Sequence, residues 1–245
     1  MLTKPLLIFI MQGINMSMLK DEYSSEINIP SPSHEKGKIN KCLLEFVDET
    51  LPVFQTEFKG LNISSEEVLT EHLVKTFAYH SNGKLPFIFL QEAIQKQTKG
   101  QNRKVDLGVF LHYKDDAPFF TFEAKRLPTL PKSREKEYVI GNDSYKPTGG
   151  IERFKLNLHG INLKESGIIG YVQSDTVQEW SNKINGWIYE LIGSTSISEI
   201  FWSKSDLLIN TENKTGVITK YKSENERTDK STIVLHHFLV DITGR

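Results

Sequence analysis

The sequence contains almost no cysteine. Cys42 is the one cysteine among 245 residues, so no disulfide can form within the chain and no cysteine-based zinc-finger spacing exists. Low cysteine usage is typical of proteins in a reducing cytosol, and we expect a cytoplasmic protein. The seven histidines include no His-Glu-x-x-His arrangement, which excludes the zinc-protease helix that this motif marks.

Long apolar runs and an excess of one charge are also missing. The apolar stretch from Leu6 to Met11 is too short to span a membrane, and we expect no membrane association. The formal net charge of −1 argues against a protein that coats nucleic acid through bulk electrostatics, although it leaves room for local basic patches. Walker and Rossmann glycine patterns are absent as well, which argues against those two kinds of nucleotide site.

The composition that remains is that of an ordinary globular protein. Hydrophobic residues make up 38% of the chain and charged residues 25%, close to the average for soluble domains, and a chain of this length can bury a full core. We expect residues 1–38 to form a weakly ordered N-terminal tail that ends in the turn-rich stretch IPSPSHEKGK. Residues 39–245 are expected to form a single domain.

The spacing of apolar residues predicts an α/β domain with a central mixed β-sheet flanked by helices. A helix is expected to start at residue 39 and stop before Pro52, because proline interrupts helices. The other expected helices cover 64–80, 150–160 and 175–193. Buried strands are expected over 85–95, 104–112, 119–127 and 167–174, with further extended segments over 198–210 and 231–243.

Two neighbouring apolar strands each carry a carboxylate. Asp106 lies in the run VDLGVFL and Glu123 in FFTFEAK. Side chains alternate along a strand, so Lys125 shares the face of Glu123. If the connecting turn centres on residues 114 and 115, Asp106 lies directly opposite Glu123 on the same face. A register shift by two residues would stagger the two acids but keep them on that face.

Like charges on adjacent strands repel, by a fraction of ~1 kcal/mol when solvated and by more when buried. A divalent cation is the simplest compensation, because Mg²⁺ and Mn²⁺ prefer oxygen ligands. Asp106, Glu123 and Lys125 therefore predict a place where a metal ion and a phosphate meet. The alternative is a hairpin whose charges decorate a solvated face, but the run DLGVFL is apolar on both faces, which disfavours it.

The spacing of Asp106, sixteen residues, and then Glu123-Ala124-Lys125 resembles the PD-(D/E)xK phosphodiesterase superfamily of restriction-endonuclease-like nucleases. The resemblance extends over roughly residues 60–175, and Val105 replaces the proline of the motif. It implies a restriction-endonuclease-like core, a single nuclease-like domain over 39–245, and Mg²⁺ or Mn²⁺ held by Asp106, Glu123 and the carbonyl of Ala124. It also implies that Lys125 orients the attacking water or stabilises the developing charge.

Members of this superfamily often carry a further glutamate on the helix before the sheet. Glu66, Glu67 and Glu71 are the candidates here. Glu67 has a structural role available, because Ser64 and Glu67 form a Ser-x-x-Glu capping box. Glu66 falls on the inward-facing stripe of the helix, where an acid is unexpected, so we predict that Glu66 completes the site and helps to hold a metal ion.

Five other residues are weaker candidates. Gln91 and Glu92 end the strand that precedes the Asp106 strand, and either residue is placed to add a contact to metal or water. Gly150 opens a short helix whose N-terminus suits a phosphate. Arg153 and Lys155 follow on that helix and are expected to neutralise phosphates of a nucleic acid.

The sequence therefore predicts a Mg²⁺-dependent phosphodiesterase. The resemblance favours a DNA endonuclease that serves in restriction or defence. No separate recognition domain is present, so specificity would come from the loops of the chain, from a homodimer or from a partner protein. Two alternatives stay open: a catalytically inactive nuclease-like interaction subunit, and a nuclease that acts on RNA.

Overall fold

The computed structural model describes residues 32–95, 102–112, 117–143, 146–194, 200–212 and 218–245. The chain divides into two compact units, Met1–Cys42 and Leu43–Arg245. Most of the expected N-terminal tail, residues 1–31, lies outside the described residues. A helix begins at Pro32, before the start expected at residue 39. The second unit contains the sheet and all the predicted site residues.

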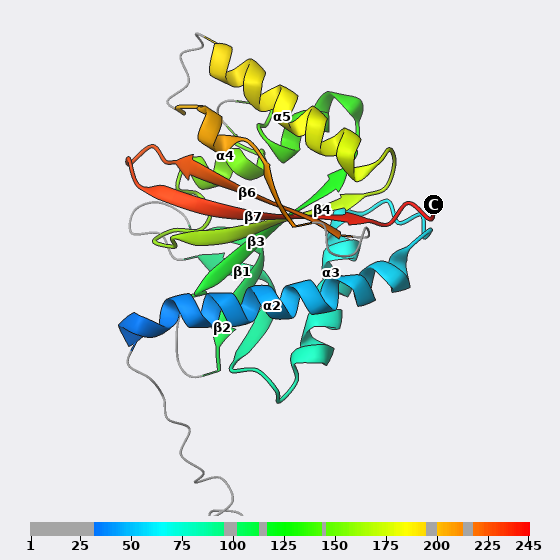
Figure 1. The fold of residues 1–245 in the computed structure, drawn as a ribbon, viewed down its shortest axis with the longest axis vertical. Helices are drawn as coiled ribbons and strands as arrows, with labels where there is room; N and C mark the ends of the chain where they lie inside the picture. The colour runs from blue at the N-terminus through cyan, green and yellow to red at the C-terminus, as the bar shows by residue number, and fades with distance from the viewer. Residues whose placement is uncertain (1–31, 96–101, 113–116, 144–145, 195–199, 213–217) are drawn as a thin grey trace, which may run out of the picture. The chain divides into compact units, whose positions relative to one another are not determined.

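A mixed β-sheet forms the centre of the second unit (Figure 1). Among the described residues it has seven strands in the order β1-β2-β3-β4-β7-β6-β5. The pairs β3–β4 and β4–β7 are parallel, and all the other neighbours are antiparallel. The strands are β1 Phe87–Gln95, β2 Arg103–Leu111, β3 Phe120–Leu127, β4 Glu165–Val172, β5 Ile209–Glu212, β6 Ile218–Glu226 and β7 Thr232–Asp241. The predicted α/β class with a mixed sheet is confirmed.

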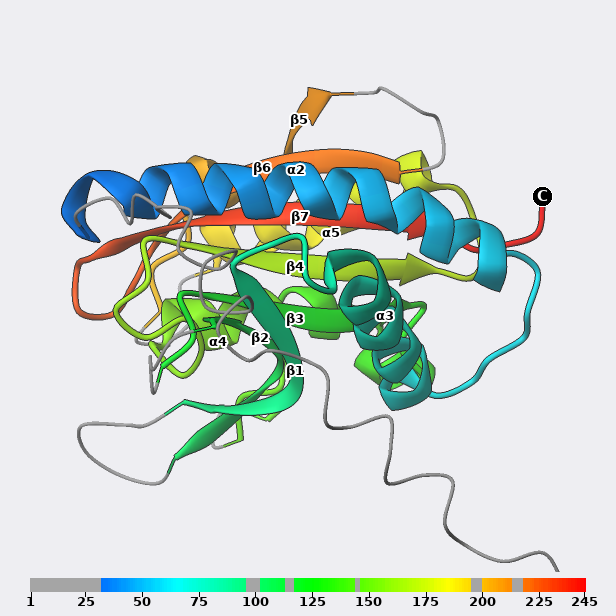
Figure 2. The same cartoon turned by 90° about the horizontal axis from the view of Figure 1, so that it is seen from below.

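Helices flank both faces of this sheet, as Figures 1 and 2 show. Helix α3 and the part of α2 that follows Cys42 lie on one face, and α4 and α5 lie on the other. The helices are α2 Pro32–Phe58, α3 Glu66–Ser81, α4 Gly150–Lys155 and α5 Val177–Gly193, with 3₁₀ turns η1 Lys132–Tyr138 and η2 Lys204–Asp206. Within the part of the chain that the structure describes, no helix is both long and apolar enough to cross a membrane.

The prediction that the first helix stops before Pro52 is wrong. Helix α2 continues through Pro52 to Phe58. A proline inside a helix costs roughly 3 kcal/mol, and burial of the next turns offsets that cost. Phe54 is fully buried, with its ring 5.8 Å from that of Tyr171, and the ring of Phe58 lies 4.9 Å from that of His72. The apolar stripe of α2 therefore extends beyond the proline.

Each face of the sheet has its own apolar core. On the α2–α3 face, the ring of Phe46 lies 5.7, 6.2 and 5.6 Å from the rings of Phe77, Phe87 and Phe89, in tilted and edge arrangements that aromatic pairs favour. On the other face, Trp180 of α5 is fully buried in a cluster of aliphatic and aromatic residues. The two cores hold β3 and β4 rigidly in the middle of the sheet.

The C-terminal half contains one strand that the sequence did not predict. Strand β6 reads ITKYKSENE, and its many polar residues hide the alternation that marks a strand. It pairs with β7 along nine residues, from Ile218 opposite Val240 to Glu226 opposite Thr232. Segment 198–210, expected to be extended, contains η2 and the start of β5 instead of one long strand.

A buried polar network explains the adjacent histidines of β7. His237 is fully buried, and its Nδ1 and Nε2 lie 3.0 Å from the Tyr138 hydroxyl and 2.8 Å from Ser223 Oγ. His236 points to the opposite face, where its Nε2 lies 3.4 Å from Glu165. Burial, together with the neighbouring His236, lowers the pKa of His237 to about 3, so the imidazole is neutral at physiological pH.

We expect His237 to make the protein acid-sensitive. Because its pKa in the folded state is about 3 and ordinary histidine titrates near 6.5, the unfolded state binds more protons between these two pH values. The folded state thus loses up to about 1.4 kcal/mol per pH unit from this residue as the pH falls through that window. Urea unfolding across it should show a smaller pH slope for His237→Gln than for the parent. Equal slopes would contradict the assignment of a neutral, buried imidazole.

Candidate active site

Strands β2 and β3 separate at the predicted acid pair. They pair in the predicted register, with Leu107 opposite Phe122, and the ladder ends at that pair. Beyond that pair, the side chain of Asp106 connects the two strands: its Oδ2 accepts a hydrogen bond of 2.8 Å from the backbone amide of Ala124. A carboxylate thus replaces a strand-to-strand hydrogen bond. This arrangement fixes Asp106 against β3 beside Glu123.

Glu123 is a fully buried carboxylate surrounded by basic side chains. Its Oε1 accepts hydrogen bonds from Lys125 Nζ at 2.8 Å and from Arg153 Nη1 at 2.7 Å. Its Oε2 lies 2.8 Å from His159 Nδ1, although neither atom meets hydrogen-bond geometry. A buried carboxylate without compensating charge would be strongly destabilising. The three neighbours supply that compensation.

The turn after α4 holds His159 in place. Gly160 adopts φ +62, and a Cβ at this position would lie 2.9 Å from Ser166 Oγ, so only glycine fits comfortably. Its amide donates to Gln95 Oε1 at 3.1 Å, and its carbonyl accepts from buried Arg227 at 2.6 Å. These contacts come from β1 and from the residue after β6. They leave the His159 imidazole little freedom to move away from the acid.

Glu66 reaches the same place from the first turn of α3. Its Oε1 lies 3.5 Å from Lys125 Nζ, and its Oε2 accepts from the backbone amide of Arg126 at 2.9 Å. The guanidinium of Arg126 donates to the carbonyl of Ser64 and, at 2.7 Å, to Gln173 Oε1. This clamp attaches the start of α3 to the ends of β3 and β4. The structure therefore brings Glu66, Asp106, Glu123 and Lys125 together.

Burial and charge shift the ionisation of the three central residues. Burial and then the Glu123 carboxylate raise the pKa of Asp106 to about 6; the residue keeps some exposure, but its carboxylate is enclosed. Burial opposes ionisation of Glu123 too, yet Lys125, His159 and Arg153 hold its pKa well below the usual range. Burial alone would lower the pKa of Lys125, but Glu123, Glu66 and Asp106 raise it above the usual range.

Two of the three predicted metal ligands already accept hydrogen bonds from Lys125. Lys125 Nζ donates at 2.8 Å to Glu123 Oε1 and at 3.0 Å to the carbonyl of Ala124. Among the described residues, no group of three or more His, Cys, Asp or Glu side chains is arranged to hold a metal ion. The ammonium group of Lys125 therefore lies beside both of these oxygens.

The competing acids and Gln91 lie elsewhere. The predicted capping box of Ser64 and Glu67 is wrong, because Ser65 is the N-cap of α3 and accepts from the Val68 amide. The Glu67 carboxylate accepts a hydrogen bond from the Ser65 hydroxyl at 2.7 Å. Glu71 pairs with Lys75 on the exposed side of α3 at 2.5 Å. Gln91 donates weakly to the Glu67 carbonyl at 3.4 Å.

Glu92 also points away from the acid pair. Its carboxylate lies 2.8 Å from Lys104 Nζ, and both side chains are largely exposed. The backbone of Glu92 has φ +49, an uncommon value for a residue other than glycine. Neither Glu92 nor Gln91 therefore joins the site in this conformation.

Two of the three predicted phosphate-binding residues are corrected by the structure. Lys155 is fully buried, and its Nζ lies 2.5 Å from Asp206 Oδ1 and 4.9 Å from the ring centre of Trp202, so it faces the core and cannot meet a phosphate. Gly150 is buried as well: a Cβ there would lie 2.9 Å from the Tyr138 carbonyl oxygen. The glycine is required for close packing of α4 and offers no open phosphate site.

Arg153, the third, does lie at the site, on Glu123. Sequence reasoning missed His159, Arg126 and Gln173 altogether. Arg126 directly follows Lys125 and Gln173 directly follows β4. A polar residue at the end of each of these apolar strands was the sequence feature that indicated them. His159 had no such feature in the sequence, because its contact with Glu123 depends on how α4 turns back over the sheet.

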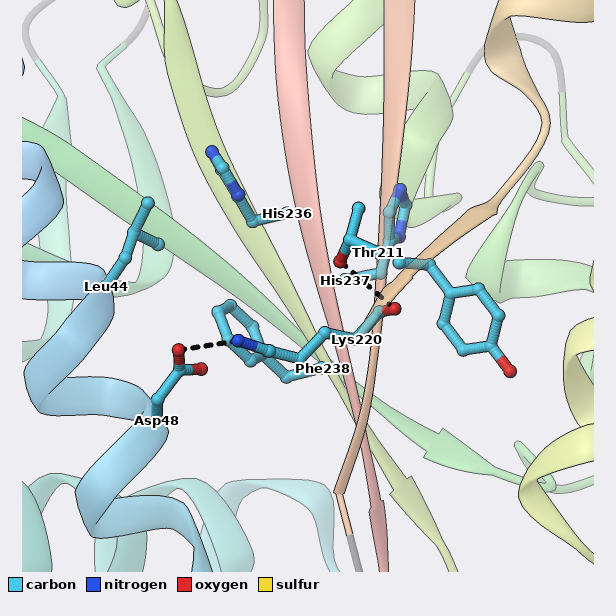
Figure 3. A pocket seen from close by; sticks show the side chains of 8 residues that line it. Leu44, Asp48, Thr211, Lys220, His236, His237 and Phe238 are labelled. Carbon is cyan, nitrogen blue, oxygen red and sulfur yellow. Dashed lines mark hydrogen bonds and ion pairs between the residues drawn. The ribbon is translucent and has the colours of Figure 1, made fainter. Parts of the chain in front are cut away.

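A small cavity lies apart from this site. It has a volume of about 110 Å³ and lies between α2 and strands β5, β6 and β7 (Figure 3). Asp48, paired with Lys220 at 2.7 Å, and His236 face it. None of the predicted site residues lines the cavity, so its position does not argue for or against the acid cluster.

The correction at Lys155 can be tested through stability. Lys155→Met leaves the buried Asp206 without its partner, and we expect a loss of about 3–5 kcal/mol in the free energy of unfolding, measured by urea denaturation. The matched variant Lys75→Gln removes an exposed pair and should unfold like the parent. Parental stability of Lys155→Met would mean that the buried ion pair is not formed.

Comparisons with known proteins add no family to this description. No protein-family model, no curated protein and no solved structure matches the chain. The candidate active site therefore rests on the chain's own residues and on their geometry.

Proposed function

We propose that this chain is a metal-dependent nuclease with a restriction-endonuclease-like core, which hydrolyses phosphodiester bonds of nucleic acid. One observation carries the proposal. An acid from α3, an acid from β2 and an acid with a lysine from β3 meet at the point where β2 and β3 separate: Glu66, Asp106, Glu123 and Lys125. Their order and spacing in the sequence resemble those of the PD-(D/E)xK superfamily, with Val105 in place of the motif's proline.

The chemistry of the donor atoms suits Mg²⁺ or Mn²⁺. Asp106, Glu123 and the Ala124 carbonyl offer oxygen ligands, which hard cations prefer. The carboxylate of Glu66 lies near them, 3.5 Å from the ammonium of Lys125. Asp106 has a backbone hydrogen bond but no ion pair with a described basic side chain. An enclosed acid of this kind favours an added cation. When bound, such a cation polarises a phosphate oxygen and makes water more acidic.

The chain's own residues would divide the remaining work. Lys125, whose pKa lies above the usual range, stays an ammonium at neutral pH, so it acts as a hydrogen-bond donor and not as a base. It would orient the attacking water or stabilise the negative charge that develops on the oxygens of the scissile phosphate in the transition state. Water attack opposite the leaving oxygen would yield a 5′-phosphate and a 3′-hydroxyl. Glu66 and Arg126 hold the start of α3 against this lysine.

We further propose DNA as the substrate and restriction or defence in the cytoplasm as the setting. Within the described part of Leu43–Arg245, the sheet and its flanking helices form one compact unit, with no separate recognition domain beside them. The specificity of the chain would therefore come from its loops, a homodimer or a partner protein. The site offers nothing that separates DNA from RNA, and parallel digests of duplex DNA, single-stranded DNA and RNA decide between these substrates.

A catalytically inactive interaction subunit is the second candidate. The observation that favours it is that both oxygens of Glu123 already have partners. Titration calorimetry with Mn²⁺ in the presence of a short DNA duplex separates the two: an inactive module of this kind does not bind the metal, whereas a nuclease does.

The nuclease proposal predicts the loss of metal-dependent cleavage in Asp106→Ala and Lys125→Ala. Each should cut plasmid DNA in Mg²⁺ slower by a factor on the order of 10²–10³, because each removes a group that acts on the reacting phosphate. Gel analysis of plasmid nicking measures the rate, and circular dichroism checks the fold. Asp229→Ala, in the turn before β7, is the control. Unchanged cleavage in both site variants would refute the proposal.

A second pair of variants tests the role of Glu66 by comparison with Glu67, its neighbour in the first turn of α3. Glu66→Gln removes the charge near Lys125, and we expect cleavage to fall by about 10–100-fold. Glu67→Gln, one residue on, affects only the Ser65 cap and should retain the parental rate. Initial rates on the same plasmid give the comparison. An equal loss in both variants would show that helix stability, and not contact with the site, explains the effect.

A further inference from the structure

We infer that the ion pair between Arg153 and Glu123 hinders metal binding until a phosphate displaces the arginine. We call this ion pair the latch. In the protein without nucleic acid, the guanidinium of Arg153 occupies the Glu123 oxygen that a metal ion needs. A phosphate of the nucleic acid draws the guanidinium away, so that metal and nucleic acid bind cooperatively. The inference rests on the proposed function and adds a regulatory step to the same site.

The starting point is the crowding around one carboxylate oxygen. Glu123 Oε1 accepts from Lys125 at 2.8 Å and from Arg153 at 2.7 Å, and Oε2 faces His159 at 2.8 Å. A carboxylate has about four lone-pair positions on two oxygens. With two cationic donors on one oxygen and an imidazole at the other, Glu123 can join a metal readily only if one neighbour leaves.

Burial decides which neighbour can leave. The side chains of Lys125 and His159 are 6% and 4% exposed, whereas that of Arg153 is 26% exposed. Lys125 is held in addition by Glu66 and the Ala124 carbonyl, and His159 by the Gly160 turn. Arg153 is the one of the three with a path to solvent.

Arg153 is also weakly held apart from its contact with Glu123. Among the described residues, its guanidinium makes one other hydrogen bond, from Nε to the Pro147 carbonyl, and that bond is long at 3.3 Å. A guanidinium presents a planar fork of donors that matches phosphate as well as carboxylate. A nucleic-acid phosphate that approaches Lys125 would therefore compete directly with Glu123 for Arg153.

This exchange has a distinctive consequence for an arginine variant. Loss of the guanidinium removes one of the two cationic donors to Glu123 Oε1, so metal binding without nucleic acid should become tighter. The same loss removes a phosphate contact, so nucleic-acid binding without metal should become weaker. A purely structural role of Arg153 would weaken both kinds of binding.

The experiment compares the parent with Arg153→Gln, Arg153→Lys and Lys230→Gln, which removes a charge from an exposed pair with Glu226. Calorimetry measures Mn²⁺ affinity without nucleic acid, and fluorescence anisotropy measures the affinity for a short labelled DNA duplex in EDTA. For Arg153→Gln we expect Mn²⁺ to bind about three- to tenfold tighter and DNA several-fold weaker. Arg153→Lys, which keeps the charge, and Lys230→Gln should stay near the parent for Mn²⁺.

Each result has one meaning. Tighter Mn²⁺ binding together with weaker DNA binding in Arg153→Gln supports the latch, also where the parent itself binds no Mn²⁺. If the parent binds Mn²⁺ and a folded Arg153→Gln binds it equally or more weakly, the latch is overturned and the nuclease proposal still stands. Unchanged DNA affinity of Arg153→Gln overturns the latch in the same way. If neither the parent nor Arg153→Gln binds Mn²⁺, the nuclease proposal falls and the latch with it. Thermal melts establish that Arg153→Gln is folded, and Arg153→Lys repeats the DNA test if it is not.

Discussion

A negative charge with no access to water is the constraint on which this structure depends. Glu123 is fully buried in the third strand, and the cost of a buried carboxylate without partners exceeds the typical effect of a single mutation. Its compensation comes from Lys125 on the same strand, from Arg153 on α4 and from His159 in the following turn. The segment 150–160 must therefore fold back over the sheet, and Gly150 and Gly160 permit that close approach.

The sheet places this charge where two kinds of strand pairing meet. On one side β3 pairs with β2 in antiparallel fashion for only three residue pairs, and on the other side it pairs in parallel with β4 along its length. Where β2 leaves β3, Asp106 completes the hydrogen bonding through its side chain. The opening at this fork is where polar side chains can approach the middle of the sheet without breaking its backbone hydrogen bonds.

Much of this site could be predicted from sequence, because the relevant patterns are local. Alternation along two strands and a short connection place Asp106 opposite Glu123, and helical periodicity distinguishes Glu66 from Glu67. The outcome for Lys155 was not predictable in this way, because its partner Asp206 is distant in sequence and the choice between core and solvent depends on tertiary packing. Contacts across the chain also explain His159 and strand β6, whose polar residues Ser223 and Asn225 are buried beside β7.

The charge pairs that stabilise the fold at this site are the same pairs that would hinder the proposed metal binding. Three acids, Glu66, Asp106 and Glu123, lie near the basic side chains of Lys125 and Arg153 and the imidazole of His159. Compensation of the Glu123 charge stabilises the fold without any bound ion, but under the proposed function it would also hinder metal binding at that carboxylate. Asp106, which has no ion-paired partner among the described residues, retains the tendency to attract a cation. If the proposed function holds, such a site would favour a cation at Asp106 while Glu123 is compensated, and Arg153, the most exposed of the three neighbours of Glu123, is the one that a phosphate would reach.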